Sequence, residues 1–553
     1  MKETALMPAW KLWANPLIRR YIRARLRPQM LAVWLLLTVL LAAFVFLMVR
    51  TGAMNRSGML DVDAERMPLT ALMVIQAVIL FFLGTGQVAG GITAEADEGV
   101  LDYQRLTPMT PLAKALGYLF GLPVREWVMF ASTLPFTAWC LWRGQVPFSA
   151  WGPVYLVMIT SAVLYHLTGL AAGLVAKNRR WAFLLSMGII ILLYTVLPQV
   201  SKFGLIFFEY ITLWPVVNEQ MMHLIPREAG GMMKLAAALT PKVSLFDLEF
   251  SELVFTLFCQ AGMGLTLLAM VWRRWRSTEC HLLGKAWALG LFVWMQVLLL
   301  GNALPLIETG RVFPTLNFQR MIRSSQLKSW QPTFQEALFV VGIYGLVTML
   351  LVLALALMTT PALDTQFRGL RRARKLSLPT VPRWSDAASA LPVTLAMSVI
   401  GTLAWHTFAQ AMITSKWFPG HVFQAWTLPV MFGVMLNATL LFQTTQEGWG
   451  KKRLFLLFIL LGIVPPMAGA VLGMAADRLL PLTTWLSVLS PLSGPIVTPT
   501  VAATGTDLPA QIARAVPRSF GFWQSCLSLT VIWLLIRLRT LHRERRTKVM
   551  HEV

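Results

Sequence analysis

Long apolar runs, each about as long as a membrane-spanning helix, recur from one end of the chain to the other. The first half contains six of them, at residues 31–49, 69–92, 127–142, 152–176, 181–200 and 253–272. The second half contains six more, at residues 286–306, 337–358, 391–413, 423–442, 454–474 and 520–536. A helix of about 20 apolar residues crosses a bilayer, and in lipid only helices and closed barrels satisfy every backbone polar group. The pattern predicts an all-α polytopic integral membrane protein with about twelve transmembrane helices.

The two sets of runs share a layout, which predicts two six-helix halves. Each half has a loop after its second run, a short basic turn after its fourth and a long segment between its fifth and sixth. Repeats of this kind are common in transport folds. We divide the chain into an N-terminal amphipathic helix within residues 1–30, a first six-span unit at 31–276 and a second, divergent unit at 277–553 with a loop at 359–390.

The chain is strongly basic, with a formal net charge of +23. Most Lys and Arg residues cluster beside the apolar runs, and most fall on one side of the membrane if the N-terminus is cytoplasmic. This asymmetry predicts that both termini are cytoplasmic and that the basic clusters contact membrane lipid. Nucleic acid is excluded as a partner, because it would need one contiguous basic face on a soluble module.

The N-terminal segment has the spacing of an amphipathic helix. From Trp10 to Leu26, apolar residues recur every three or four positions, and Arg19, Arg20 and Arg23 occupy much of the other face. Trp and Arg in this arrangement are typical of a helix that lies in the headgroup layer of a membrane. The segment is therefore expected to lie on the cytoplasmic surface.

An acid-rich segment with a distinctive order follows the second apolar run. Residues 95–111 read EADEGVLDYQRLTPMTP. Glu95 and Glu98 are three positions apart and share one helical face, while Gly99 permits a break in the chain. Two prolines then end the segment and turn the chain into the third run. The pattern predicts a rigid elbow; the alternative is that the acids only cap helix ends.

This segment resembles the signature of the permease subunits of type-2 ABC exporters, loosely E-x-x-E-G-T-L-x-x-L-L-x-T-P-L-S. In that family it forms a short coupling element that docks on a separate ATPase subunit. The resemblance places a coupling element at residues 93–112 and implies ATPase-coupling roles for the following residues: Glu95, Asp97, Glu98, Gly99, Leu101, Leu106, Thr107, Pro108 and Pro111. Val100 and Thr110 depart from the pattern.

The same resemblance bears on three other parts of the chain. The N-terminal segment, with Trp10, Arg19, Arg20 and Arg23, is similar to the connecting helix that lies beside the ATPase in this family. The long segments at 201–252 and 475–519 correspond to re-entrant helices there, the alternative being an outer soluble subdomain. The loop at 359–390 departs from the family, because it is basic and lacks the acid-rich signature.

Arg125 and Glu126 stand at the start of the third run and form a candidate intramembrane pair. Ionisable groups at membrane depth are rare and often functional, although both side chains could also reach the interface. The sequence contains no phosphate-binding loop, no H-E-x-x-H and no G-x-S-x-G motif. We therefore predict neither a catalytic site nor a metal site nor a cofactor on this chain.

These observations favour a transport subunit rather than an enzyme. The resemblance implies an ATP-driven ABC permease of a bacterial inner membrane, with ATP hydrolysed by separately encoded ABC ATPase subunits. One chain would supply both halves of the permease, or two chains would form a dimer. The alternative is a twelve-span secondary transporter of the major-facilitator kind, which would instead need a basic motif after the second span. A membrane enzyme acting on lipid-linked substrates is a third class.

Overall fold

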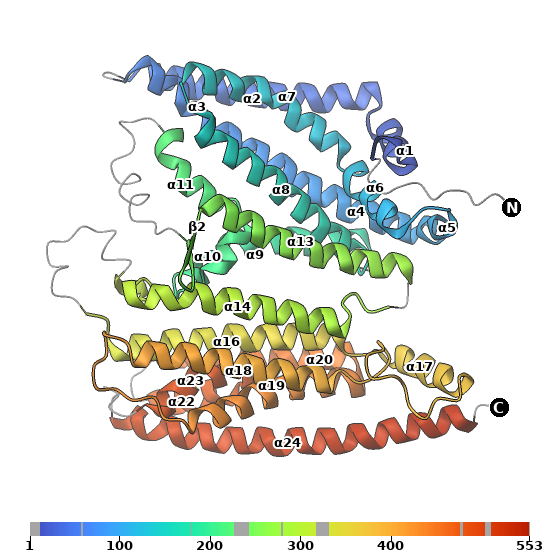
Figure 1. Ribbon diagram of the computed structural model, residues 1–553, viewed down its shortest axis with the longest axis vertical. Coiled ribbons are helices and arrows are strands. Elements are labelled where there is room, and N and C mark those ends of the chain that lie inside the picture. The colour runs from blue at the N-terminus through green and yellow to red at the C-terminus, as the bar shows by residue number, and fades with distance from the viewer. Residues whose placement is uncertain are drawn as a thin grey trace. The chain divides into compact units, whose positions relative to one another are not determined.

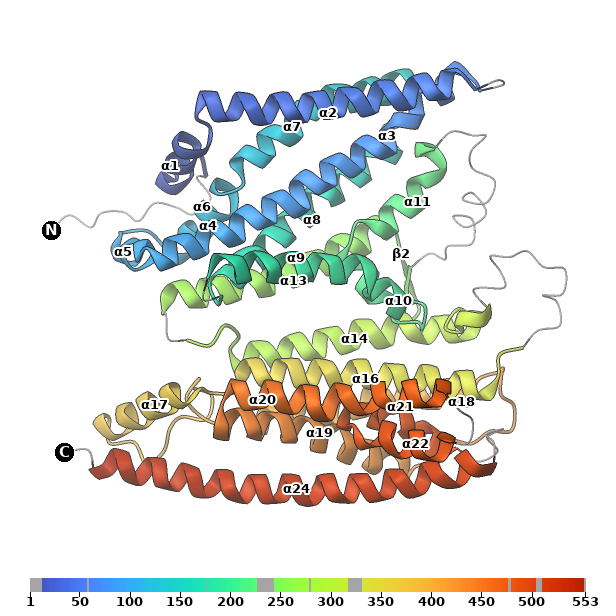
Figure 2. The same ribbon diagram turned by 180° about the vertical axis from the view of Figure 1, so that it is seen from behind.

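The computed structural model describes residues 12–56, 59–176, 178–225, 243–277, 280–316, 331–475, 479–503 and 510–551. In these residues almost every element is helical, and the one sheet consists of two short strands, β1 (Val243–Leu245) and β2 (Leu248–Phe250) (Figures 1 and 2). The chain forms two compact units. Unit 1 comprises Met1–Ser201, Ile206–Ser244 and Leu248–Thr278, and unit 2 comprises Glu279–Val553 with Lys202–Leu205 and Leu245–Asp247.

Unit 1 is a bundle of long helices with short helices at both ends. Its long elements are α2 (Pro28–Met54), α3 (Asp61–Ala77) continued by the π-helix η2 (Val78–Gly84) and α4 (Thr85–Asp97), α7 (Val124–Arg143), α8 (Phe148–Gly173), α9 (Arg179–Thr195) and α13 (Glu252–Arg276). The short ones are η1 (Leu12–Ala14), α1 (Pro16–Arg25), α5 (Val100–Leu106), α6 (Pro111–Gly121), α10 (Leu197–Ser201), η3 (Ile206–Ile211) and α11 (Trp214–Leu224).

Unit 2 also consists of long and short helices. Its long elements are α14 (Lys285–Thr309), α16 (Phe334–Thr359), α18 (Leu391–Ile413), α19 (Thr427–Trp449), α20 (Lys451–Leu457) continued by the π-helix η5 (Phe458–Ile463) and α21 (Val464–Ala475), and α24 (Ala510–His551). The short ones are α17 (Leu363–Lys375), α22 (Leu480–Leu489), η7 (Pro491–Ser493) and α23 (Gly494–Ala502).

The predicted all-α membrane architecture is confirmed. Among the described residues, 11 helices are long and apolar enough to cross a membrane, and a twelfth span results if the bent pair α22–α23 counts as one. The predicted third run coincides with α7, a helix of 20 residues that is not among the 11. Leu480–Leu489 and Pro491–Ala502 meet at 97°, the geometry of a broken span or a re-entrant loop, within the segment 475–519 for which we expected re-entrant helices or an outer soluble subdomain.

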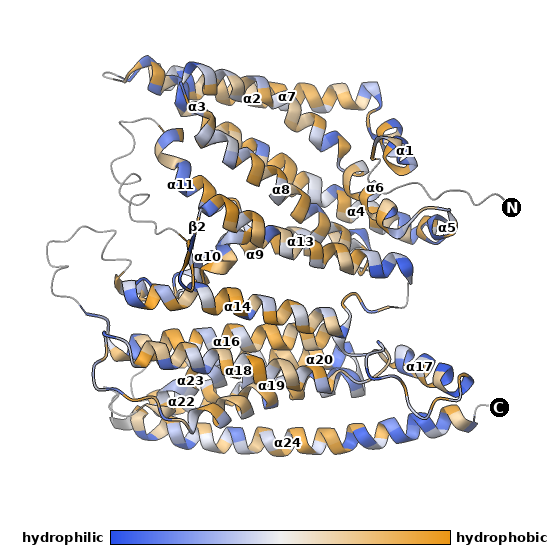
Figure 3. Ribbon diagram, viewed as in Figure 1, coloured by the Kyte–Doolittle hydropathy of each residue, from blue (hydrophilic) through white to orange (hydrophobic). Residues whose placement is uncertain are grey.

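Hydrophobic colouring predominates along the long helices, as expected of helices that cross lipid (Figure 3). On α2 the exposed side chains include Leu36, Leu40, Phe44 and Leu47. Polar colouring gathers at helix ends, notably on α17 and the last turns of α24 (Figure 3).

Candidate functional site

Glu95, on the last turn of α4, is the centre of a polar cluster at one end of unit 1. Its side chain is 9% exposed, and its two carboxylate oxygens accept hydrogen bonds from the hydroxyls of Tyr21 on α1 and Tyr118 on α6. The guanidinium of Arg20 lies 2.9 Å from Oε1. Burial, together with the neighbouring carboxylate, raises the pKa of both tyrosines far above the usual range. Both hydroxyls therefore stay protonated and donate to Glu95.

The N-terminal helix is fixed to α6 by a cap and by close packing. Asn15 Oδ1 accepts a hydrogen bond from the backbone N–H of Leu17, and Pro16 occupies the first helical position. Asn15 Nδ2 donates to the carbonyl of Ala113 on α6 at 2.7 Å. A Cβ on Gly121 would approach Tyr21 Cδ2 to 2.7 Å, so only glycine permits this helix spacing.

This cap corrects one expectation. The predicted helix from Trp10 to Leu26 is not continuous, because the chain forms the short η1 at Leu12–Ala14 and begins α1 only at Pro16. Asn15 is extended, and the proline ring would clash with a preceding helical turn. Trp10 lies outside the described residues. Arg19 donates to the carbonyl of Trp13 at 3.1 Å, Arg20 pairs with Glu95, and Arg23 is exposed.

The segment after Glu95 makes the predicted elbow. Asp97 ends α4, and Gly99 has φ +71°, the left-handed region in which other residues are strained by about 1–2 kcal/mol. The short helix α5 follows, and Thr107 Oγ1 caps it by donating to the carbonyl of Gln104 at 2.6 Å. Thr110 then caps α6, whose first residue is Pro111. A left-handed residue and two caps thus fix both ends of the elbow.

Lys114 holds α5 against α6. Its ammonium donates to the carbonyls of Arg105 and Thr107, both at 3.2 Å, and these belong to the C-terminal end of α5. The residue is only 4% exposed, and burial lowers the pKa of its amine, with Arg105 adding to the shift. A cation at a helix C-terminus also complements the helix dipole. The lysine therefore makes the elbow a rigid part of unit 1.

The two leucines of α5 point in opposite directions. Leu101 is 5% exposed and packs in a core cluster with Tyr118 and with Trp275 from the end of α13. The Tyr118 and Trp275 rings stack with centroids 5.2 Å apart. Leu106 is 83% exposed, and Tyr103 on the same helix is 70% exposed. One face of α5 is therefore anchored, and the other presents apolar and aromatic surface outside unit 1.

The acids beyond Glu95 lie on the surface. Asp97, Glu98 and Gly99 are exposed, as are Asp102 and Pro108. Glu95 and Glu98 thus differ in environment although they share a motif.

We call α1, the end of α4, α5, α6 and the end of α13 the Glu95 platform. Of these elements, α1, α5 and α6 lie together at one end of unit 1 (Figure 1).

Arg125 and Glu126 form a partly buried ion pair near the start of α7. Arg125 Nε and Nη2 lie 3.0 and 2.6 Å from Glu126 Oε1, and Glu126 is 1% exposed. The guanidinium also lies over the ring of Trp34, 4.6 Å from its centroid. Among the described residues, Glu126 pairs with Arg125 whereas Glu95 pairs with Arg20.

Several residues of the platform were not singled out from the sequence. Tyr21 is one of the apolar positions of the amphipathic segment, Lys114 and Tyr118 lie between the second and third apolar runs, and Trp275 follows the sixth run. A lysine and a tyrosine in the otherwise apolar stretch of α6 could have indicated a polar cluster, because a buried polar group needs a hydrogen-bond partner. Asn15 before Pro16 was a second signal, since Asn is favoured at helix N-caps.

No group of three or more His, Cys, Asp or Glu residues that could hold a metal ion occurs in the described part of the chain. Comparison of the chain with protein-family models, with curated proteins and with solved structures finds no match in any of the three. The platform is thus described by its own geometry alone.

Proposed function

We propose that the chain is the permease subunit of an ATP-driven ABC transporter of the type-2 exporter kind, and that the Glu95 platform docks on a separately encoded ATPase subunit. The observation that carries the proposal is the construction of α5. Leu101 packs in a core cluster with residues of α1, α4, α6 and α13, while Leu106, Tyr103, Asp97 and Glu98 are all exposed. An element built in this way transmits a push from outside into the bundle.

The charge of the surface supports a protein partner. Asp97 and Glu98 are exposed acids, Asp102 pairs with Arg105, and Leu106 and Tyr103 are exposed apolar and aromatic side chains, in a chain whose net charge is +23. Basic surfaces next to a membrane are expected from insertion bias alone, but exposed acids beside exposed apolar side chains are not. Aromatic and apolar residues with charges at the rim are typical of protein interfaces.

The proposal specifies the orientation of the chain in the membrane, the subunit that binds ATP and the direction of transport. The platform faces the cytoplasm of a bacterial inner membrane, both termini are cytoplasmic, and ATP binds only to the partner. Closure of the ATPase pair would displace the platform, and α4 would carry the displacement into the second span. The substrate would move outward, with one chain or a dimer of chains forming the pathway.

Co-purification tests the proposal. Tagged protein is extracted from its native membrane in mild detergent, and retained proteins are identified by mass spectrometry. The expected partner contains the phosphate-binding loop that this chain lacks, and the complex hydrolyses ATP in a vanadate-sensitive manner. Glu98→Arg and Leu106→Asp should each reduce the retained ATPase about tenfold, a loss of roughly 1.4 kcal/mol in binding.

Glu308→Arg is the matched control, because Glu308 is an exposed acid near the end of α14 in unit 2. This variant should retain the ATPase as the unaltered protein does. Absence of any phosphate-loop protein from the purified material would contradict the proposal. It would favour the secondary-transporter class, whose transport stops with a protonophore and ignores vanadate.

A further inference from the structure

Two arginines from different helices flank the C-terminal half of α4 in unit 1. Arg25, the last residue of α1, donates from Nη1 to Gln87 Oε1 at 2.6 Å. Arg179, the first residue of α9, packs on the same helix, because a Cβ on Gly90 would lie 3.2 Å from its Nε. On the adjacent Gly91, a Cβ would lie 3.4 Å from Arg25 Nη2. The two guanidinium groups therefore lie at neighbouring positions of α4.

Arg125, near the start of α7, is a third cation in this region. Burial lowers the pKa of the Arg25 guanidinium, and Glu126 opposes this shift. Arg125 and Arg179 add to the shift, because like charges disfavour the protonated form. A guanidinium nevertheless stays protonated in proteins. We call Arg25, Arg125 and Arg179 the arginine cluster; the carboxylate that acts on Arg25 belongs to Glu126, which already pairs with Arg125 at 2.6 Å.

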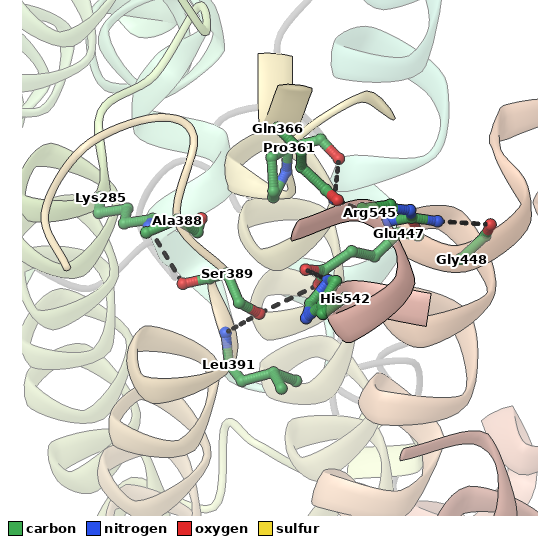
Figure 4. Close-up of polar contacts among 10 residues, drawn as sticks. All are labelled: Lys285, Pro361, Gln366, Ala388, Ser389, Leu391, Glu447, Gly448, His542 and Arg545. Atoms are coloured by element: carbon green, nitrogen blue, oxygen red, sulfur yellow. Dashed lines mark hydrogen bonds and ion pairs between the residues drawn. The ribbon is translucent and has the colours of Figure 1, made fainter. Parts of the chain in front are cut away.

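The buried polar cluster around Glu447 in unit 2 shows a different balance of charge (Figure 4). His542 Nε2 lies 3.1 Å from Glu447 Oε1, and Ser389 Oγ donates to Oε2 at 3.1 Å. Arg545 donates to Gln366 Oε1 at 2.5 Å. One guanidinium there accompanies one carboxylate, whereas the arginine cluster gathers three guanidinium groups around one carboxylate. The arginine cluster therefore carries positive charge that an anion from outside the chain can neutralise.

The face of α4 beside the arginine cluster is open to the outside of unit 1. Leu83, near the end of η2, is 42% exposed. Three half-buried residues follow at intervals of three or four and share its face: Gln87, Gly91 and Ala94. From Leu83 to Gly91 the helix rises about 12 Å. An accessible strip thus runs along α4 from an apolar end at Leu83 to the arginine cluster.

Apolar side chains border this strip. On α9, which packs on α4, Phe183 is 46% exposed. Its ring also contacts α4, because a Cβ on Gly86 would lie 2.6 Å from Phe183 Cε2. On the other side of the cluster, the Arg125 guanidinium lies over the ring of Trp34 on α2. The surroundings of the strip therefore combine cationic and apolar groups.

The order of these features selects the ligand. A soluble anion would use the arginines but not the apolar end of the strip, and a zwitterionic lipid would bring its own cation close to the guanidinium groups. Basic sites between helices at the membrane surface suit anionic headgroups, whose acyl chains continue toward the bilayer core. We propose that the arginine cluster and the open face of α4 bind one anionic phospholipid, with its phosphate at the arginines and an acyl chain along Leu83.

Native mass spectrometry of the full chain tests this site without an ATPase, so its outcome is independent of the proposed function. Delipidated protein in mild detergent is titrated with dioleoylphosphatidylglycerol, with dioleoylphosphatidylcholine and with glycerol 3-phosphate. Phosphatidylglycerol should bind at one site at least about tenfold more tightly than phosphatidylcholine, because each arginine near an anionic headgroup strengthens binding about fivefold. Equal affinity for the two lipids would overturn the proposal. Displacement of phosphatidylglycerol by an equal concentration of glycerol 3-phosphate would also overturn it, since the acyl chain would then contribute nothing.

A pair of double variants separates the site from general attraction to a basic surface. Arg25→Gln with Arg179→Gln should weaken the binding of phosphatidylglycerol at least about tenfold. Arg27→Gln with Arg180→Gln is the matched control, because it removes the same charge from exposed arginines close by in the sequence. This control should change the affinity less than about twofold. An equal loss in both double variants would overturn the proposal.

A measurement on the unaltered protein guards against misfolding of the variants. A phosphatidylglycerol with a diazirine in one acyl chain should label the strip near Leu83 and Phe183 in nanodiscs of phosphatidylcholine. Added unlabelled phosphatidylglycerol should suppress this labelling several-fold and leave labelling of the exposed Leu40 and Phe44 on α2 almost unchanged. Equal suppression on both surfaces would overturn the proposal, because the lipid would then have no preferred site.

Discussion

At the scale of single residues, unit 1 depends on one carboxylate. Glu95 accepts hydrogen bonds from two tyrosine hydroxyls and pairs with Arg20, so α1 and α6 are both joined to α4 through a side chain that is 9% exposed. Glu98, three residues later, is exposed. Two acids of one sequence motif therefore have different tasks, one holding the platform together and the other facing outward.

Replacing Glu95 by Ala should destabilise the platform. Both buried tyrosine hydroxyls would lose their acceptor, which we expect to lower the free energy of unfolding by about 3 kcal/mol. Glu98→Ala should change the free energy of unfolding by less than about 0.5 kcal/mol, because an exposed carboxylate makes few contacts that the substitution would remove. Unfolding in detergent, followed by heat or denaturant, measures both. Equal effects of the two substitutions would show that the Tyr21 and Tyr118 bonds contribute nothing.

Gly99 offers a second residue-scale prediction. A Cβ on Gly99 meets no atom within 4 Å, so Gly99→Ala is penalised only by its φ of +71°, by about 1 kcal/mol. Gly188 on α9 also has nothing within 4 Å, but it lies within a regular helix, where alanine is favoured by up to about 1 kcal/mol. The two variants should therefore shift the unfolding midpoint in opposite directions. Shifts of the same sign would contradict the role of the left-handed turn.

At the scale of elements, the N-terminal helix is held by packing against two glycines of α6. Gly117 would place a Cβ 2.9 Å from Leu17, and Gly121 would place one 2.7 Å from Tyr21. Small residues four apart let helices approach closely, and here they serve a surface helix rather than two spans. The position of α1 thus depends on α6 as much as on its own amphipathic pattern.

Gly121→Val should release α1 from the platform. The added side chain would clash with Tyr21 and with the backbone of Ile18, so residues 16–25 should exchange amide hydrogen at least about tenfold faster. Gly52→Val on α2 is the control, because a Cβ there meets nothing within 4 Å. Hydrogen exchange with mass spectrometry detects the change. Unaltered protection of α1 in the Gly121 variant would mean that the glycine contact does not hold the helix.

The positions of the long helices could be predicted from the sequence, but the contacts that build the Glu95 platform could not. The run at 391–413 coincides with α18, because about 20 apolar residues between polar ends leave little choice of register. Leu101 and Leu106 carry the same apolar signal, yet one is buried and the other exposed, since α5 is too short for periodicity to define a face. The partners of Glu95 come from segments 74 and 23 residues away, which no local pattern records.

At the scale of the whole molecule, the proposed topology predicts which residues a water-soluble reagent can reach from each side of the membrane. Basic clusters beside the apolar helices favour a cytoplasmic platform, so Glu98→Cys should react with a membrane-impermeant maleimide in inverted vesicles only. Arg143→Cys, at the far end of α7, should react in right-side-out vesicles only, as both residues are exposed. Labelling of both cysteines from the same side would contradict the topology.

The most direct test of the platform as a docking surface is photocrosslinking from Leu106 in intact cells. A photoreactive phenylalanine analogue at this exposed position should form an adduct with a protein that carries a phosphate-binding loop. The same analogue at Leu37, an exposed residue of α2, should form no such adduct, because lipid surrounds it. An ATPase adduct from Leu106 alone is the predicted result. Absence of that adduct, or its equal formation from Leu37, would contradict the proposed function.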